Sequence, residues 1–133
     1  QTPGGITVET PRTKQRAVIY CRVSTDRQEA DGESLDYQED KCRRYAELHD
    51  IDIVAVLKEV KSGFIHYSFR DQLTLVRSFV RDHLADTVIV WDLRRFSRNF
   101  VHSAMIFAEI ENNGGEIVSV SENIDNSLTG KLI

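Results

Sequence analysis

Short apolar segments alternate along this chain with longer segments whose apolar residues recur every three or four positions. Residues 17–23 are mostly apolar, residues 51–57 are rich in β-branched side chains, and residues 87–91 and 117–120 are again apolar. Short apolar runs of this kind are typical of strands that are buried on both faces. The pattern therefore predicts a strand at each of these places.

Helical spacing fills the intervals between the predicted strands. One helix is expected from about Ser34, a suitable N-cap, to His49, and another over residues 70–84. A third begins near Phe100 and ends at residues 112–115 (NNGG), a strong signal for a helix C-terminus. Alternation of apolar strands and helices predicts an α/β fold, with a mostly parallel sheet and helices on both faces.

Size and composition indicate one globular domain. The chain has 133 residues and a net charge of −4, which argues against tight DNA binding by this part alone. Its two cysteines form no CxxC pair, as in reduced cytoplasmic proteins, and no apolar run reaches membrane-spanning length. Residues 1–16 are polar and contain two prolines and two glycines, so a flexible leader is expected there.

Polar side chains follow each of the first three predicted strands. Ser24 comes after the first, Ser62 after the second, and the arginine-rich segment 94–98 after the third. Parallel sheets bind ligands beyond the carboxyl ends of their strands, so these three loops should open on one edge. The arginines expected near Ser24 are Arg22, Arg70, Arg95 and Arg98.

Several arginines around one serine suit a phosphodiester substrate. The planar guanidinium bonds two phosphate oxygens at once and keeps its charge. A serine hydroxyl among such groups is a candidate nucleophile for phosphoryl transfer, in which proteins contribute mainly positioning and electrostatic stabilisation. The loops carry no HExxH motif, DxD pair or carboxylate cluster, so an arginine-based mechanism without a metal is expected.

Four segments carry a family resemblance: residues 20–38, which include YCRVST and SLDYQ, residues 62–70, residues 88–98 (VIVWDLRRFSR) and residues 125–133. In this order and spacing they resemble the N-terminal catalytic domain of the serine recombinases, the family of resolvases, invertases and large serine integrases. The resemblance covers residues 17–133 and implies a resolvase-like catalytic domain. The leader and the long loop at residues 29–33 favour a large serine integrase.

The resemblance implies a site-specific DNA recombinase. Ser24 would attack the scissile phosphate and join covalently to a DNA 5′ end, and strand exchange and religation would follow without a metal or ATP. Arg22, Arg95 and Arg98 would hold the phosphate and stabilise its transition state. Arg70 and Gln28 would support them, Gln38 and Ser62 would line the pocket, and Tyr20 would pack near Ser24.

The resemblance also implies partners and context. The substrate would be double-stranded DNA, and the full-length protein would form a dimer and a synaptic tetramer. A long helix and DNA-binding domains would follow residue 133 and supply most of the DNA affinity. Such a protein would be cytoplasmic, encoded by a bacterium or a phage. The isolated domain is expected to cleave DNA poorly.

One position departs from the family pattern. The family usually carries aspartate immediately before the arginine that aligns with Arg95, and here that position is Arg94. The role of this aspartate is either dispensable or taken over by Asp92 or Glu59. The group that handles the proton of Ser24 is therefore left open.

Two other interpretations compete with the recombinase. Cys21 and Arg27 satisfy the C-x5-R spacing of cysteine phosphatases, although residues 22–26 lack the glycines that a phosphate-wrapping loop favours. The third interpretation is a non-catalytic module that binds a phosphate ligand at its basic edge.

Overall fold

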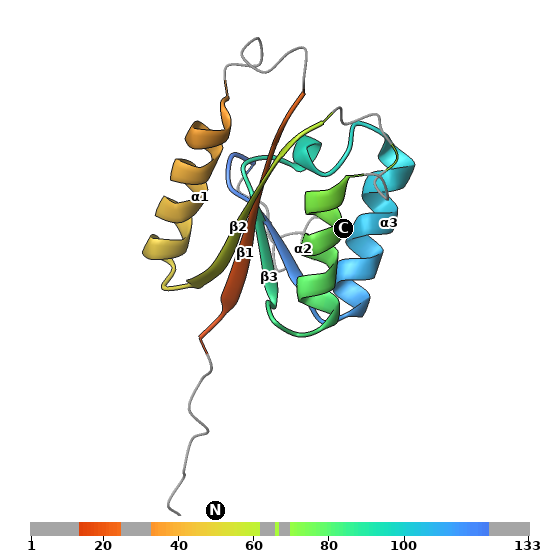
Figure 1. Ribbon diagram of the computed structural model, residues 1–133. Coiled ribbons are helices and arrows are strands. Elements are labelled where there is room, and N and C mark those ends of the chain that lie inside the picture. The colour runs from red at the N-terminus through yellow and green to blue at the C-terminus, as the bar shows by residue number, and fades with distance from the viewer. Residues whose placement is uncertain (1–13, 25–32, 62–65, 67–69, 123–133) are drawn as a thin grey trace, which may run out of the picture.

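The computed structural model describes residues 14–24, 33–61, 66 and 70–122. Strands and helices alternate through this part of the chain (Figure 1). None of its helices is long and apolar enough to cross a membrane. The elements are β1 (Arg16–Val23), α1 (Leu35–Leu48), β2 (Asp52–Val60), α2 (Asp71–Arg81), β3 (Thr87–Val90), the 3-10 helix η2 (Leu93–Arg95), α3 (Phe100–Asn112) and β4 (Glu116–Ser119).

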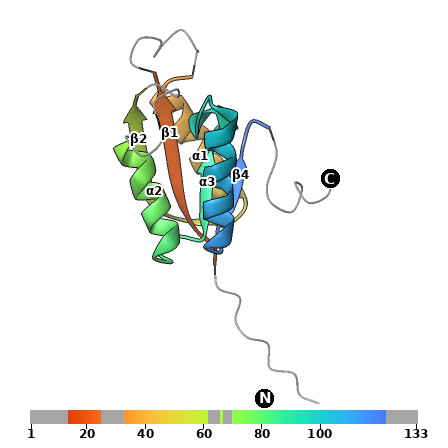
Figure 2. The same ribbon diagram turned by 90° about the vertical axis from the view of Figure 1, so that its right-hand side faces the viewer.

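All four strands are parallel and lie in the order β2-β1-β3-β4. Helix α1 covers one face of the sheet, and α2 and α3 cover the other (Figures 1 and 2). The predicted α/β fold with helices on both faces is therefore confirmed. Because the strands are parallel, Ser24 after β1 and η2 after β3 lie at the same edge of the sheet.

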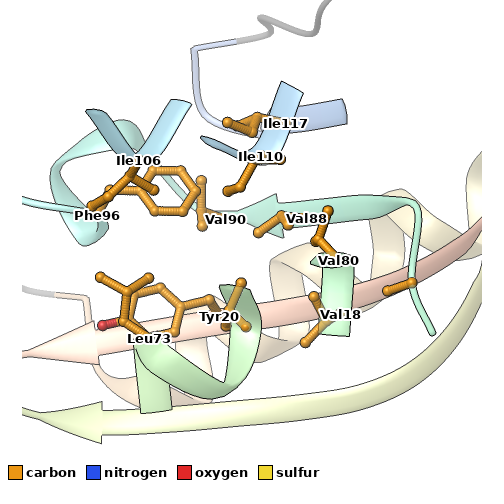
Figure 3. Close-up of a cluster of buried hydrophobic side chains, with 12 residues drawn as sticks. Val18, Tyr20, Leu73, Val80, Val88, Val90, Phe96, Ile106, Ile110 and Ile117 are labelled. Carbon is orange, nitrogen blue, oxygen red and sulfur yellow. The ribbon is translucent and has the colours of Figure 1, made fainter. Parts of the chain in front are cut away.

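Strand β1 divides the core into two clusters by the alternation of its side chains. Ala17, Ile19 and Cys21 pack on the α1 side, and Val18 and Tyr20 pack on the α2 and α3 side. Figure 3 shows the second cluster, in which Val18 and Tyr20 of β1 lie among side chains from α2, α3 and β3.

Strand β2 is longer than the predicted 51–57. It pairs with β1 from Asp52 onward, with one irregularity at Val54, and ends at Val60 opposite Val23. The extension could not be predicted from the sequence, because the polar residues Lys58 and Glu59 interrupt the apolar pattern. Strand β1 also begins one residue earlier than expected, at Arg16.

Helix α2 ends at Arg81, before the predicted 84. His83 has a left-handed backbone with φ 61°, which ends the helix, and the amides of Leu84 and Ala85 turn back to the carbonyl of Phe79. Helix α3 ends as predicted: Gly114 has φ 84°, and a Cβ on Gly115 would lie 2.8 Å from Val80 Cγ1.

Candidate active site

The carboxyl edge of the sheet holds an unusual concentration of buried charge. Arg22, Arg70 and Arg95 are 0%, 0% and 1% exposed, and Ser24, directly after β1, is 6% exposed. Arginine is rarely this buried unless its N–H groups are paired. The bonds of these guanidiniums therefore define the site.

The Arg22 guanidinium ties three segments together. Its Nε donates to the Arg95 carbonyl at 3.0 Å, Nη1 donates to the Lys61 carbonyl at 2.8 Å, and Nη2 donates to the Arg94 carbonyl at 2.8 Å. The residues after β2 and after β3 are thus fixed to the strand that leads into Ser24.

Positive charge accumulates around Arg22. Burial, together with the charges of Arg70, Arg95 and Arg98, lowers the pKa of Arg22 to about 10. That value still lies far above neutral pH, so the guanidinium keeps its charge. Positive charge is therefore concentrated next to the Arg22 guanidinium, which suits an anionic ligand.

The end of β1 is held by side chains in place of a neighbouring strand. The pairing between β1 and β3 stops at Ile19, so the backbone of Arg22 has no partner in β3. The Gln38 side chain accepts from the Arg22 amide at 3.2 Å and donates to its carbonyl at 3.0 Å. Arg95 Nη1 donates to the same carbonyl at 3.0 Å. Gln38 and Arg95 thus hold the strand end that presents Ser24.

Arg70 forms a second buried network with Tyr20. Its Nη1 donates to the Phe96 carbonyl, and Nη2 donates to the Arg95 carbonyl at 2.6 Å and to the Tyr20 hydroxyl at 2.7 Å. The Tyr20 hydroxyl in turn donates to Glu59 Oε1 at 2.6 Å. The turn that contains η2 is thereby anchored to β1 and β2.

Glu59 holds the start of α2. Its carboxylate accepts from the amides of Gln72 at 2.9 Å and Leu73 at 3.3 Å, and it lies 3.6 Å from Arg70 Nε. Helix α2 has no side-chain cap of its own, so Glu59 caps it from the neighbouring strand. Burial also raises the pKa of Tyr20 above its usual range, which keeps its hydroxyl protonated as a donor to Glu59.

Arg95 lies between two carboxylates. Its Nη2 is 2.7 Å from Glu33 Oε1, and its Nε is 3.2 Å from Asp92 Oδ1. Asp92 also accepts from the Arg94 amide at 3.1 Å, which caps η2, and lies 3.0 Å from Arg94 Nη2. Of the two carboxylates considered as substitutes for the family aspartate, Asp92 contacts Arg95, whereas Glu59 caps α2.

The structure brings together most of the site residues that the sequence predicted. Arg98 follows η2, is exposed, and is close enough for its charge to act on Arg22. Gln28 and Ser62 lie outside the described residues. The predicted residues that gather around the end of β1 are Tyr20, Arg22, Ser24, Gln38, Arg70 and Arg95.

The role expected of Arg22 and Arg95 in holding a phosphate stays a prediction. In the structure the Arg22 N–H groups bond backbone carbonyls, and Arg95 bonds the Arg22 carbonyl and carboxylates. The physical reason is their burial, because each N–H removed from water needs a partner. The sequence analysis also missed Glu33, a single acidic residue in a polar stretch with no distinctive pattern.

The cysteine phosphatase interpretation is wrong. Cys21 is completely buried and packs toward α1 with Cys42, on the face of the sheet opposite the arginines. Burial raises the pKa of Cys21 to about 12, so the thiol stays protonated at neutral pH. A protonated thiol in an apolar core is not a nucleophile.

Comparison with known proteins identifies the family. Residues 17–133 match the family described as resolvase, N-terminal domain. The Transposon Tn552 DNA-invertase BinR of Staphylococcus aureus is 31% identical over 118 residues, which is 86% of this chain and 53% of that protein. A relative from Bacillus subtilis is 31% identical over 115 residues, which is 86% of this chain but 22% of that protein. The chain thus spans about half or less of these relatives.

Solved structures agree with this assignment. The N-terminal catalytic domain of TP901-1 integrase has a TM-score of 0.79 and 28% identity, with 89% of this chain and 88% of that chain covered. The C-terminal catalytic domain of ISC1926 TnpA, an IS607-like serine recombinase, has a TM-score of 0.70 and 28% identity, with 88% and 77% covered. On these grounds the chain belongs to the resolvase N-terminal domain family, the catalytic domains of serine recombinases.

Proposed function

We propose that this chain is the catalytic domain of a site-specific DNA recombinase in which Ser24 is the nucleophile. The observation that carries the proposal is the position of Ser24 at the end of β1, beside a cluster of buried arginines that bind one another's backbone. A serine at a rigid, cationic edge is positioned to attack a phosphodiester, because the positive field stabilises the charge that develops on phosphorus-bound oxygens.

The proposed reaction exchanges one phosphodiester for another. Ser24 Oγ bonds to the scissile phosphorus and loses its proton, the bond from phosphorus to the 3′ oxygen breaks, and that oxygen takes up a proton. A 5′-phosphoserine and a free 3′ hydroxyl result. After strand exchange, a 3′ hydroxyl attacks the phosphoserine and regenerates the serine. Since the bond energy is conserved, the cycle consumes no ATP, and the arginines supply the charge that a metal would provide.

The arginines have different proposed roles. Arg98, which is exposed, and the cationic groups of Arg22 and Arg95 provide the phosphate-binding field, while Arg70 positions the turn that carries Arg95. Arg22 and Arg95 act on the phosphate only after some of their present bonds are exchanged for bonds to it. Gln28 and Ser62 are the further supporting residues proposed for the active site.

Asp92 is the proposed partner in proton transfer or orientation. Of the two carboxylates considered as substitutes for the family aspartate, it is the one that contacts Arg95 and Arg94, and its side chain is 8% exposed. Glu59 is committed to the α2 amides and to Tyr20. Substitution of Asp92 should therefore slow cleavage, whereas substitution of Glu59 should mainly lower stability.

DNA binding and oligomerisation of the full-length protein are proposed from its family membership. The full-length protein is proposed to bind double-stranded DNA chiefly through segments outside this chain, to dimerise, and to form a tetramer that cuts two sites. The net charge of −4 supports this division, because a domain of that charge gains little from the phosphate backbone by itself. Appreciable DNA cleavage by the isolated chain would contradict it.

Covalent trapping tests the nucleophile. The full-length protein is incubated with a nicked duplex that carries the recombination site, so that the released fragment diffuses away and the protein remains joined to DNA. Wild type and Cys21→Ser should become attached through a 5′ phosphate, and Ser24→Ala should not. Ser97→Ala is a matched control, because Ser97 is also 6% exposed.

The outcomes separate the competing functions. Attachment that persists in Ser24→Ala, or that is lost only in Cys21→Ser, contradicts the proposed nucleophile. Tight, specific DNA binding with no attachment in wild type favours the non-catalytic phosphate-binding module. Peptide mapping of the trapped complex to Ser24 is the expected result.

A further inference from the structure

Two carboxylates and two guanidiniums meet beside η2. Glu33 Oε1 lies 2.7 Å from Arg95 Nη2 and 3.5 Å from Arg94 Nη2. Asp92 Oδ2 lies 3.0 Å from Arg94 Nη2 and 3.4 Å from Arg95 Nη2. Each of these two oxygens therefore contacts both arginines, an arrangement that a phosphate oxygen can also adopt.

The two carboxylates are held very differently. Asp92 belongs to the turn itself, caps η2 through the Arg94 amide, and has a side chain only 8% exposed. Glu33 comes from a segment more than 60 residues away in the chain, and its side chain is 26% exposed. Asp92 is thus a fixed part of the turn, whereas Glu33 is the anion that can be exchanged.

Burial explains why an internal anion is present. The Arg95 side chain is 1% exposed, so its charge has been largely removed from water. A buried guanidinium is costly unless charge and hydrogen bonds compensate it. Where the family usually has aspartate, Arg94 adds a second cation, so Asp92 alone does not neutralise the pair. The Glu33 carboxylate supplies the missing negative charge.

We infer that Arg94 and Arg95 form a phosphate seat that the Glu33 carboxylate occupies, and that a DNA phosphate must displace Glu33 to bind there. The inference rests on the proposed function for the identity of the phosphate. Glu33 then acts as an internal competitor that weakens anion binding until the DNA phosphate is delivered at high local concentration. Phosphate binds only the molecules in which the seat is open. The apparent affinity is therefore the intrinsic affinity multiplied by the fraction of molecules with an open seat.

Inorganic phosphate is a direct probe of the seat. Binding to the full chain is followed by NMR at the Arg95 Nε–Hε signal, with sodium chloride adjusted to constant ionic strength. Glu33→Gln removes the charge but keeps a carbonyl oxygen that accepts from Arg95, so the fold should be preserved. The expected result is about tenfold tighter phosphate binding than in wild type.

Glu39→Gln is the matched control. Glu39 is also a partly buried acid, with a side chain 21% exposed, but it pairs with Lys58 of β2 and Arg43 of α1. Its substitution removes the same charge and should leave phosphate affinity unchanged. In Glu33→Gln, the further change Arg94→Gln should abolish most of the gain in affinity.

Phosphate affinities of the variants decide whether the seat exists. A folded Glu33→Gln chain with unchanged phosphate affinity, or an equal gain in Glu39→Gln, overturns the inference. If Glu33→Gln does not fold, Glu33→Asp is used: the shorter carboxylate should give an intermediate gain, and no gain overturns the inference. Phosphate binding is independent of covalent trapping at Ser24, so failure of the proposed function leaves this test readable. Conversely, trapping at Ser24 with no effect of Glu33→Gln overturns the seat alone.

Discussion

The two faces of β1 are equally buried but are stabilised in different ways. Ile19 and Cys21, on the α1 face, and Tyr20 and Arg22, on the opposite face, are all 0% exposed. The α1 face needs only apolar neighbours, because its side chains carry few polar atoms. The opposite face becomes polar toward its carboxyl end, where the Tyr20 hydroxyl donates to Glu59 and all three nitrogens of the Arg22 guanidinium donate to backbone carbonyls.

This difference shows where the molecule is sensitive to change. When an apolar side chain on the α1 face is shortened, its neighbours relax and partly refill the space. When a partner is removed from the polar network, a buried donor or acceptor is left unsatisfied, which costs more than the bond itself contributed. The site is thus built from groups that stabilise the fold only as a complete set.

The largest effect is expected from Arg70→Met. Methionine keeps the apolar length but removes the bonds to the carbonyls of Phe96 and Arg95 and to the Tyr20 hydroxyl. Since Glu59 also loses its cationic neighbour, the free energy of unfolding should fall by about 3–5 kcal/mol. Urea denaturation followed by circular dichroism measures the change.

A double variant sharpens this prediction. Arg70→Met with Glu59→Gln removes the carboxylate that the single change leaves buried without its cation. The double variant should therefore lose less stability than the sum of the two single changes. Strictly additive losses would show that the two side chains do not act as a pair.

Tyr20→Phe should have a moderate effect. The ring keeps its packing against Phe96, but the hydroxyl that donates to Glu59 and accepts from Arg70 is removed. The expected loss is about 1–2 kcal/mol in urea unfolding. Tyr37→Phe, on an exposed ring, should change stability by less than about 0.5 kcal/mol. Equal losses in the two variants would contradict a special role for the buried hydroxyl.

The smallest effect concerns the α1 face and appears only at alkaline pH. The pKa of Cys21 is raised from about 9 to about 12 in the folded protein, so the unfolded chain ionises first as the pH rises. The stability linked to this thiol is complete below about pH 9 and is lost toward pH 12, by about 1 kcal/mol at pH 10. Cys21→Ala should flatten this part of the stability profile between pH 8 and pH 10, measured by thermal unfolding. A profile of unchanged slope would contradict the prediction.

The fold could be predicted from the sequence because the signals that specify each strand and helix are local. The apolar runs of β1 and β3, the Ser34 cap and the glycines after α3 each specify nearby backbone. The polar end of β2 was missed because Lys58 and Glu59 resemble loop residues when their partners are unknown. The position of Ser24 was found by the same local reasoning, since it follows a buried strand directly.

The sequence predicted where the arginines of the site lie but not which groups they bind. That Arg22, Arg70 and Arg95 would gather at one edge follows from the topology of a parallel sheet. What they bind does not, because a guanidinium can face a ligand, a carbonyl or a carboxylate with equal geometric ease. The pocket-lining role of Gln38 stays a prediction, whereas the bonds of its amide to the end of β1 could not be predicted from the sequence.

By itself, the sequence determined the order of the elements, the edge of the sheet at which the arginines gather and the position of Ser24 at that edge. These properties depend on periodicity and on the rule that parallel strands end together. Only the tertiary structure decided that the arginines are bound to backbone carbonyls, that Glu59 caps α2, and that Glu33 lies against Arg95. Such contacts join residues far apart in the chain, and burial selects them by the need to satisfy every charge removed from water.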